Sequence, residues 1–330
     1  MKMNEWWGEH DGIDFPHVVL SQQFDRKQLE QLFKLTFILK EVIGKGTAVN
    51  WLNGKILAAI FYEASTRTRL SFETAALRLG AQVISSENAK EFSSAIKGET
   101  LEDTVRIISS LADIMVLRHS DDDAAERAAK VPHSIPILNG GSGKGQHPTQ
   151  ALLDVFTIHE HFCKVEGLKV AMVGDLLRGR TVRSLTYMLS KFAGVEITFV
   201  APAIAQIKLD IKDHLAENGI KWQETEDFRE VAKEVDVIYM TRYQLERTSS
   251  QEEKSQLAEA SHNHRMTSEV ANSMKSNAII LHPLPRIEEI RWNVDNNPRA
   301  KYFQQAANGV FVRMALLLAI FNPAKARELL

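Results

Sequence analysis

The chain has 330 residues, of which 40 are Lys or Arg and 42 are Asp or Glu, giving a formal net charge of −2. At about 150 residues per domain, this length predicts two domains. The charge balance disfavours nucleic-acid binding, which needs a basic excess or stripe, and the lone cysteine excludes a disulfide scaffold. The longest apolar run, 314–321, is far shorter than the roughly 20 residues of a membrane helix. We therefore expect a cytoplasmic protein with no membrane or nucleic-acid partner.

Short apolar runs alternate with segments of helical period along the chain, and this predicts an α/β fold. The runs expected to be strands are 56–61, 82–84, 113–117, 135–138, 169–173, 196–200, 236–240 and 278–281. Continuous apolar runs between helices are typical of buried parallel strands. Such strands fit either one barrel or two open sheets with mainly parallel strands. The glycine-rich stretch 139–146 favours two sheets, with a domain boundary just after it.

Three further segments have a predicted structure. The stretch from His147 to about Phe162 is expected to be a helix that crosses from one domain to the next. The polar stretch 246–269 is too long for a routine connection and is predicted to be a mobile loop. The C-terminal run 308–321 has little polarity, which predicts a buried helix.

The segment Ser65–Arg69 follows the first predicted strand and opens a helix that runs to about Gly80. A helix start offers free N–H groups and the positive end of the dipole, which together bind anions. The side chains that add donors suited to phosphate are Ser65, Thr66, Arg67 and Thr68. A simpler interpretation is that Arg69 pairs with Glu73 one turn later and that the first hydroxyls only cap the helix.

A second candidate site begins at His147, which precedes Pro148, a residue suited to the first helical turn. His147 and Gln150 are three residues apart and can share one side of the helix start. An imidazole and an amide together can hold a small planar group that has both an oxygen and an NH₂. The alternative is that His147 only caps the helix.

Further polar segments follow predicted strands or lie in connections between elements. They are 93–99 with Ser93 and Lys97, 174–181 with Arg180 at a helix start, 241–244 with Arg242 and Gln244, and 282–286 with two prolines. In isolation Lys97 is best explained as a solvated lysine. Ligands of open α/β sheets bind beyond the carboxyl ends of the strands, so the cations of these segments are expected to converge on one cleft. The substrates should then be strongly anionic.

Several familiar motifs are absent. The run 140–145 has glycine where a P-loop needs Ser or Thr, and 174–181 lacks the glycine spacing of a dinucleotide site. His159 and His161 are two residues apart and do not share a helix face. We therefore expect no metal and no cofactor. Ordinary structural roles are predicted for three further side chains, namely packing for Cys163 and exposure for His262 and His264.

Taken together, these motifs resemble the transcarbamylase family. The segments that carry the resemblance are Ser-Thr-Arg-Thr-Arg at 65–69, His-Pro-Thr-Gln at 147–150 and His-Pro-Leu-Pro-Arg at 282–286. The residues that resemble the aspartate branch of the family are Ser93, Lys97, Arg242 and Gln244. Ornithine relatives carry a cysteine where this chain has Pro283. The likeness runs in order from about Phe15 to Leu330.

The resemblance implies that carbamoyl phosphate reacts with L-aspartate to give N-carbamoyl-L-aspartate and phosphate, an early step of pyrimidine synthesis. It also implies a carbamoyl-phosphate-binding domain over 1–150, an aspartate-binding domain over 151–305, and a C-terminal helix, 306–330, that packs back on the first domain. The active site is expected in the cleft between the domains and at a subunit interface of a homotrimer. A regulatory chain or higher assembly stays open.

The family roles carry over residue by residue. The phosphate would be held by Ser65, Thr66, Arg67 and Thr68, and Arg118 would hold both the phosphate and the carbonyl oxygen. The groups at the carbamoyl carbonyl and NH₂ would be Arg118, His147, Gln150 and the backbone carbonyls of Leu284 and Pro285. The residues for aspartate would be Arg180, Arg242 and Gln244, and a neighbouring subunit would supply Ser93 and Lys97. The residues assigned to catalysis itself are Arg67, Thr68, Lys97, Arg118, His147 and Gln150.

Alternatives to this function remain at the level of sequence. One is a transcarbamylase for another amino acid such as ornithine or N-acetylornithine. Another is a non-catalytic homologue that acts as a scaffold or regulatory subunit, although the intact motifs disfavour it. A nicotinamide-dependent dehydrogenase would explain the α/β pattern but not the missing glycine fingerprint. Within the expected reaction, the acceptor of the amine proton stays open.

Overall fold

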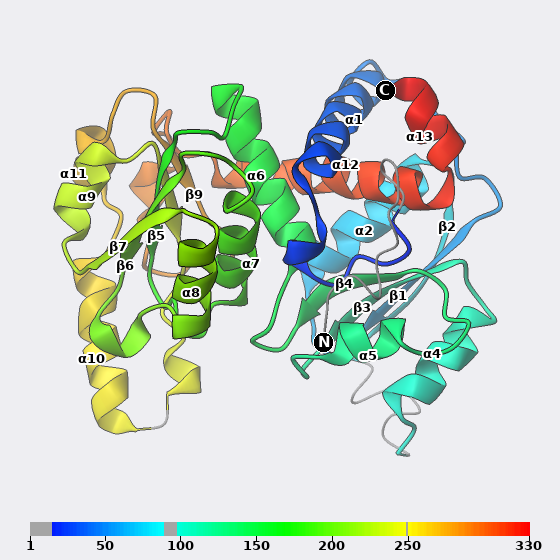
Figure 1. Cartoon of the computed structure of the whole chain (residues 1–330), viewed down its shortest axis with the longest axis horizontal. Helices are drawn as coiled ribbons and strands as arrows, with labels where there is room; N and C mark the ends of the chain where they lie inside the picture. The colour runs from blue at the N-terminus through cyan, green and yellow to red at the C-terminus, as the bar shows by residue number, and fades with distance from the viewer. Residues whose placement is uncertain (1–14, 89–97, 249) are drawn as a thin grey trace. The chain divides into compact units, whose positions relative to one another are not determined.

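The computed structural model describes residues 15–88, 98–248 and 250–330, coloured along the chain in Figure 1. The chain forms two compact units, which we call the N-terminal unit (residues up to Leu153, with Ala307–Leu330) and the C-terminal unit (Asp154–Ala306). Each division falls inside a helix, the first in α6 (Pro148–Phe162) and the second in α12 (Tyr302–Phe321). The boundaries expected from the sequence are at residues 150 and 305.

The N-terminal unit is built on a sheet with the strand order β2-β1-β3-β4, all parallel. The strands are β1 (Ile56–Phe61), β2 (Gln82–Glu87), β3 (Ile114–His119) and β4 (Ile137–Ser142). The helices of this unit are α1 (Arg26–Gly44), α2 (Thr66–Arg78), α4 (Leu101–Ser109), α5 (Ala124–Ala129), α13 (Pro323–Leu329) and the part of α12 from Ala307. Helices α4 and α5 cover one face of the sheet and α1, α2 and α12 the other (Figure 1).

The C-terminal unit is built on a second parallel sheet with the order β7-β6-β5-β8-β9. The strands are β5 (Lys169–Val173), β6 (Glu196–Val200), β7 (Lys221–Thr225), β8 (Val237–Met240) and β9 (Ile279–Leu281). Besides the end of α6, its helices are α7 (Arg180–Leu189), α8 (Leu209–Glu217), α9 (Phe228–Glu234), α10 (Gln251–Asn263) and α11 (Ser268–Ser273). Two open parallel sheets confirm the expected α/β class, and the barrel alternative is wrong.

Three segments have a different secondary structure from the one that the sequence predicts. Strand β7 was not expected, because this edge strand is exposed along most of its length and has no apolar run to reveal it. The predicted mobile loop 246–269 instead contains α10, which begins with a Ser250 side chain that accepts from the Glu253 N–H at 3.1 Å. The glycine-rich stretch is partly strand β4, because β4 extends to Ser142.

Helix α12 is long and apolar enough, by length and composition, to cross a membrane, although 61% of its most apolar window is buried inside the protein. This burial is the pattern of a core helix and agrees with the prediction for 308–321. Cys163 ends α6 with a φ of 57° and is exposed, so the packing role predicted for it is wrong.

Candidate active site

The start of α2 presents the first group of predicted phosphate ligands. Ser65 is the N-cap residue, yet its hydroxyl makes no capping hydrogen bond, and its backbone N–H donates to Glu87 at 3.1 Å. Arg67 is exposed and makes no hydrogen bond or ion pair with any residue the structure describes. Partial burial lowers the pKa of the Arg67 guanidinium, which still stays charged. A free cation thus lies at the positive end of a helix dipole, an arrangement that an anion would stabilise.

The simpler interpretation of this segment holds for Arg69 alone. Its guanidinium pairs with Glu73 at 3.0 Å, one turn along α2, and with Glu87 at 3.1 Å. Arg69 therefore has a structural role. The capping role considered for the first hydroxyls does not hold for Ser65, whose side chain is not engaged by the helix.

Thr68 and His147 lie together in the N-terminal unit. The Thr68 hydroxyl is 3.5 Å from His147 Nε2, and both residues are buried. His147 directly precedes α6, and its carbonyl accepts the N–H groups of Gln150 at 3.0 Å and Ala151 at 3.2 Å. The backbone of His147 therefore caps α6 while its ring faces α2. Two helix starts that are far apart in the sequence meet at this pair.

Arg118 comes from the end of β3 and is half-buried. Its Nη1 donates to the carbonyl of Gly140 at 3.2 Å, and its Nε lies 3.8 Å from a carboxylate oxygen of Glu63. The carbonyl of Arg118 accepts the N–H of Tyr62 at 2.8 Å. Arg118 is thus fixed between β4 and the turn that leads into Ser65.

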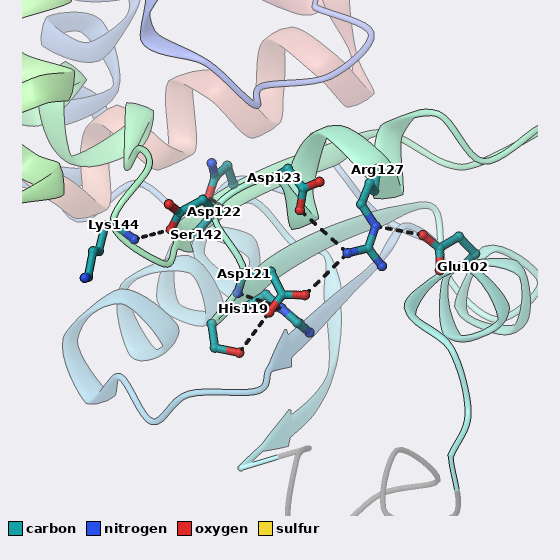
Figure 2. A network of polar contacts seen from close by, with 10 residues as sticks. Glu102, His119, Asp121, Asp122, Asp123, Arg127, Ser142 and Lys144 are labelled. Atoms are coloured by element: carbon teal, nitrogen blue, oxygen red, sulfur yellow. Dashed lines mark hydrogen bonds and ion pairs between the residues drawn. The ribbon is translucent and has the colours of Figure 1, made fainter. Parts of the chain in front are cut away.

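A polar network holds the turn that follows Arg118 (Figure 2). Arg127 on α5 pairs with Glu102 at 2.9 Å and with Asp121 at 3.3 Å. His119 Nδ1 accepts the N–H of Asp121 at 3.0 Å, and Asp122 accepts the N–H of Lys144 at 2.6 Å. These bonds tie the turn after β3 to the turn after β4, next to the Arg118 side chain.

The same close approach explains two glycines of the glycine-rich stretch. A Cβ at Gly143, whose φ is +42°, would lie 2.1 Å from a carboxylate oxygen of Asp122. A Cβ at Gly145 would lie 2.8 Å from the Asp122 carbonyl oxygen. These glycines therefore allow two turns to pack against each other just before His147, which is a different use from phosphate binding.

Arg313 on α12 contacts both α2 and α6 near their starts. Its side chain is buried, with 3% of its surface exposed. Its guanidinium donates to the Ser71 hydroxyl of α2 at 2.9 Å and to the Thr149 hydroxyl of α6 at 3.5 Å. It also lies 4.8 Å from the centre of the Phe72 ring. Arg313 therefore holds the helix that carries Thr68 to the helix that follows His147.

In the C-terminal unit, the predicted aspartate ligands follow neighbouring strands. Arg180 begins α7, which follows β5, and Arg242 and Gln244 follow β8. Strands β5 and β8 pair in parallel, with Val173 opposite Met240. Both arginines therefore leave the carboxyl edge of one sheet, where ligands of such sheets bind. The Arg242 guanidinium pairs with Glu246, and this hydrogen bond raises the pKa of Arg242.

Asp175 anchors the segment that carries Gln244. This fully buried carboxylate accepts the backbone N–H of Gln244 at 3.3 Å and pairs with Arg178 at 3.3 Å. Arg178 in turn pairs with Glu253 of α10. Burial raises the pKa of Asp175, and the Arg178 charge opposes that rise. A Cβ at Gly174 would meet the Thr241 carbonyl oxygen at 2.2 Å, so only glycine lets β5 end this close to β8.

The 282–289 loop presents the backbone carbonyls predicted at Leu284 and Pro285. The His282 Nδ1 accepts the N–H of Leu284 at 2.7 Å, so its Nε2 carries the proton and donates to Glu289 at 2.8 Å. The other oxygen of Glu289 accepts the N–H groups of residues 287 and 288, each at 3.1 Å. Burial alone would raise the pKa of Glu289, but the His282 bond and the other hydrogen bonds lower it.

This loop is also tied to the core of its own unit. The His282 N–H donates to Gln305 at 2.8 Å, and Gln305 donates to Asp154 at 2.6 Å. The second oxygen of Asp154 accepts from the Tyr239 hydroxyl at 2.9 Å. A continuous buried network thus runs from β8 to the Leu284 backbone, where a φ of 51° shows a constrained conformation.

The structure therefore brings only some of the predicted site residues close to one another. The N-terminal unit brings together Thr68 and His147, and the C-terminal unit aligns Arg180 and Arg242 on one sheet edge. Ser93 and Lys97 lie outside the described residues. The predicted convergence of Arg67, Lys97, Arg180 and Arg242 on one cleft stays a prediction. Among the described residues, no group of three or more His, Cys, Asp or Glu is placed to hold a metal.

Sequence reasoning missed the residues that support the site, namely Asp175, Glu289, Arg313 and His264. His264 was expected to be exposed but is 4% exposed, whereas His262 is exposed as predicted. The only available signal was local: Asp175 follows a strand, and Arg313 is a charge inside an apolar helix. A charge in such a place needs a buried partner.

Comparison with known proteins gives two domain matches over most of the chain. Residues 16–160 match the carbamoyl-P binding domain of aspartate/ornithine carbamoyltransferase, and residues 166–320 match the Asp/Orn binding domain. The chain belongs to the aspartate/ornithine carbamoyltransferase family. The resemblance found in the sequence motifs is thereby confirmed.

Individual relatives agree with this family. The chain is 48% identical over 300 residues to aspartate carbamoyltransferase 1, chloroplastic, of Pisum sativum, covering 91% of this chain and 77% of the relative. It is 43% identical over 306 residues to the aspartate carbamoyltransferase catalytic subunit of Aliivibrio fischeri, covering 93% of this chain and 96% of the relative.

Two solved structures are similar across both units. Aspartate transcarbamoylase from Trypanosoma cruzi in complex with N-(phosphonacetyl)-L-aspartic acid superposes with a TM-score of 0.88 at 37% identity, covering 93% of this chain and 96% of that chain. The catalytic subunit of M. jannaschii aspartate transcarbamoylase gives a TM-score of 0.85 at 40% identity, covering 94% and 99%.

Proposed function

We propose that this chain transfers the carbamoyl group of carbamoyl phosphate to the amine of L-aspartate, giving N-carbamoyl-L-aspartate and phosphate. The observation that carries the proposal is the meeting of two helix starts at Thr68 and His147, beside Arg67, which has no partner among the residues that the structure describes. Relatives named aspartate carbamoyltransferase support it, as do Trypanosoma cruzi structures described as complexes with carbamoyl phosphate and aspartate.

The phosphate of the donor is bound at the start of α2. Free N–H groups of the first turn, the hydroxyls of Ser65, Thr66 and Thr68, and the Arg67 guanidinium supply donors and positive charge. Arg67 lacks a carboxylate partner among the described residues, so its charge is available to the ligand. The same donors stabilise the extra negative charge on phosphate as it leaves.

The residues assigned to the carbamoyl group are Arg118, His147 and Gln150, together with the backbone carbonyls of Leu284 and Pro285. Arg118 and His147 donate to the carbonyl oxygen, which becomes an oxyanion when the aspartate amine attacks the carbon. Gln150 and the backbone carbonyls of Leu284 and Pro285 accept from the NH₂. The C–N bond forms, the bond from carbon to the phosphate oxygen breaks, and the amine loses a proton. Donors held in place before the reaction contribute most: removal of one costs roughly 100- to 1000-fold in turnover.

Aspartate is recognised by its two carboxylates. Arg180 and Arg242 follow paired strands, and each guanidinium can bind a carboxylate with two hydrogen bonds. The Glu246 carboxylate pairs with Arg242, and both side chains stay partly accessible. Ornithine brings a cationic side chain, which these arginines would repel, so the site selects a dicarboxylate.

We propose that the chain assembles as a homotrimer, as the family resemblance implies. Helix α2 and edge strand β2 expose large apolar side chains, with Leu70 at 46%, Leu77 at 61% and Ile84 at 40% of their surface. An exposed apolar surface next to an edge strand is typical of a subunit contact. We propose that this surface meets a second copy that supplies Ser93 and Lys97. A cytoplasmic location and a role in pyrimidine synthesis complete the proposal.

The test is a product assay with three amino acids. The purified chain, given carbamoyl phosphate, is expected to carbamoylate L-aspartate and to leave ornithine and N-acetylornithine unchanged. Subunit number is measured in parallel by light scattering. Product from ornithine at a comparable rate would move the chain to another branch, and no product from any amino acid would favour a non-catalytic homologue.

A further inference from the structure

Tyr243 stands between Arg242 and Gln244, the two residues proposed to bind aspartate, yet its ring is turned into the protein. It is 6% exposed, and its hydroxyl lies 2.6 Å from Nδ1 of His264, which is 4% exposed. Along this segment Thr241 and Tyr243 are buried, whereas Arg242 and Gln244 are half-buried. Alternating burial indicates that the two ligands point away from the side that Tyr243 occupies.

The direction of the hydrogen bond follows from the other ring nitrogen. His264 Nε2 lies 2.9 Å from the backbone carbonyl of Glu226, which can only accept, so Nε2 carries the proton. In the neutral ring Nδ1 is then the acceptor, and the Tyr243 hydroxyl is the donor. Burial lowers the pKa of His264, which keeps the ring in this neutral form. Each polar atom of the pair therefore has a partner.

The Tyr243–His264 hydrogen bond links residues 241–244 to the C-terminal end of α10. His264 is the C-cap residue of α10, whereas Glu253 in the first turn of α10 pairs with Arg178. Arg178 pairs with Asp175, which accepts the backbone N–H of Gln244. Residues 243 and 244 are thus attached to the two ends of the same helix, one through a side chain and the other through the backbone.

We propose that Tyr243 is a positioning residue for aspartate, which acts by holding Arg242 and Gln244 in place through its bond to His264. This inference rests on the proposed function and adds to it a determinant of affinity for the dicarboxylate substrate. Loss of the hydroxyl frees residues 242–244 to shift while leaving both ligand side chains in the chain. Binding of carbamoyl phosphate, whose proposed ligands do not include residues 242–244, is then unaffected.

The experiment compares Tyr243→Phe with the wild-type chain in full steady-state kinetics for both substrates. The expected result is an aspartate KM raised about fivefold to tenfold, the usual size of one net hydrogen bond. The KM for carbamoyl phosphate and the kcat are expected to change less than about twofold. Tyr187→Phe is the matched control. Tyr187 is also buried, and its hydroxyl accepts a hydrogen bond from Arg183, also on α7, at 3.4 Å.

A double-mutant cycle shows whether the effect runs through His264. His264→Gln keeps an N–H donor for the Glu226 carbonyl, but its amide oxygen does not occupy the ring position of Nδ1, so the bond to Tyr243 is lost or weakened. The double variant is expected to raise the aspartate KM no further than either single variant. A Tyr243→Phe variant with an unchanged aspartate KM, or with both KM values raised equally, would overturn the inference. A wild-type chain that makes no carbamoyl-aspartate would instead overturn the proposed function itself.

Discussion

The two units hold their candidate site residues in different ways. In the N-terminal unit, Thr68 and His147 lie at helix starts, where the backbone itself directs the side chains. In the C-terminal unit, Gln244 and the Leu284 carbonyl lie on irregular segments fixed by buried polar side chains, among them Asp175 and Glu289. The first arrangement depends on regular secondary structure, the second on individual hydrogen bonds.

This difference predicts where each unit is sensitive to mutation. A helix start tolerates the loss of one neighbour, because the backbone hydrogen bonds along the rest of the helix hold it in place. A buried polar network does not, because removing one member leaves its partner buried and unsatisfied. In the N-terminal unit, we therefore expect substitution of the proposed ligands to have the largest effect on activity. In the C-terminal unit, we expect substitution of positioning residues to affect activity as much as substitution of ligands.

The largest effect is expected for a ligand at a helix start. Arg67→Ala should lower turnover by roughly 100- to 1000-fold, since it removes the cation proposed to stabilise the leaving phosphate. The fold should be unchanged, because Arg67 is exposed and has no described partner. Kinetics and thermal unfolding check both statements. Arg106→Ala, an exposed arginine of α4, is the control, and near-normal turnover of Arg67→Ala would remove the phosphate assignment.

A smaller but still large effect is expected in the 282–289 loop. Glu289→Gln should lower turnover about tenfold or more, because its single amide oxygen cannot accept both from the His282 Nε2–H and from the two backbone N–H groups. Stability should fall by about 1–3 kcal/mol, the cost of buried groups left without partners. Urea unfolding and kinetics are the measurements, and exposed Glu288→Gln is the control. Full activity with full stability would contradict the role of this network.

Stability and carbamoyl-phosphate binding of the N-terminal unit should change when the packing around Arg313 is altered. A Cβ at Gly309 would lie 2.5 Å from Nη1 of Arg313 and 3.0 Å from Leu153. Gly309→Ala should therefore destabilise the chain by about 1–3 kcal/mol through overpacking and raise the KM for carbamoyl phosphate. Gly44→Ala in α1 is a matched control, because its Cβ meets nothing within 4 Å. Equal behaviour of the two variants would show that Arg313 has no such role.

The smallest effect is a pH dependence of stability in the C-terminal unit. Burial lowers the pKa of His264 below the ordinary value of 6.5, so the unfolded chain binds more protons just below that pH. Stability should therefore fall as the pH drops from 7 through 6 and should not depend on this group above about pH 7. Urea midpoints of wild type and His264→Gln test this, with exposed His262→Gln as control. Parallel curves for wild type and His264→Gln would contradict the assignment.

The sequence predicted what local patterns encode. The apolar runs gave both sheets. Residues 65–69 could be proposed as a phosphate site because hydroxyls, an arginine and a helix start occupy the same few residues. Strand β7 was missed because an exposed edge strand needs no apolar residues. The burial of His264 could not be predicted, because it depends on Glu226 and Tyr243, which are distant in the sequence. Family resemblance supplied residue roles that patterns alone left open.

The exposed thiol of Cys163 gives the protein one attachment point for a fluorescent dye, since the chain has no other cysteine. Each copy would therefore carry a single fluorophore. Stepwise photobleaching of labelled particles would count the copies directly, and three steps per particle are expected for the proposed assembly. The same dye would let exchange of copies between assemblies be followed in real time.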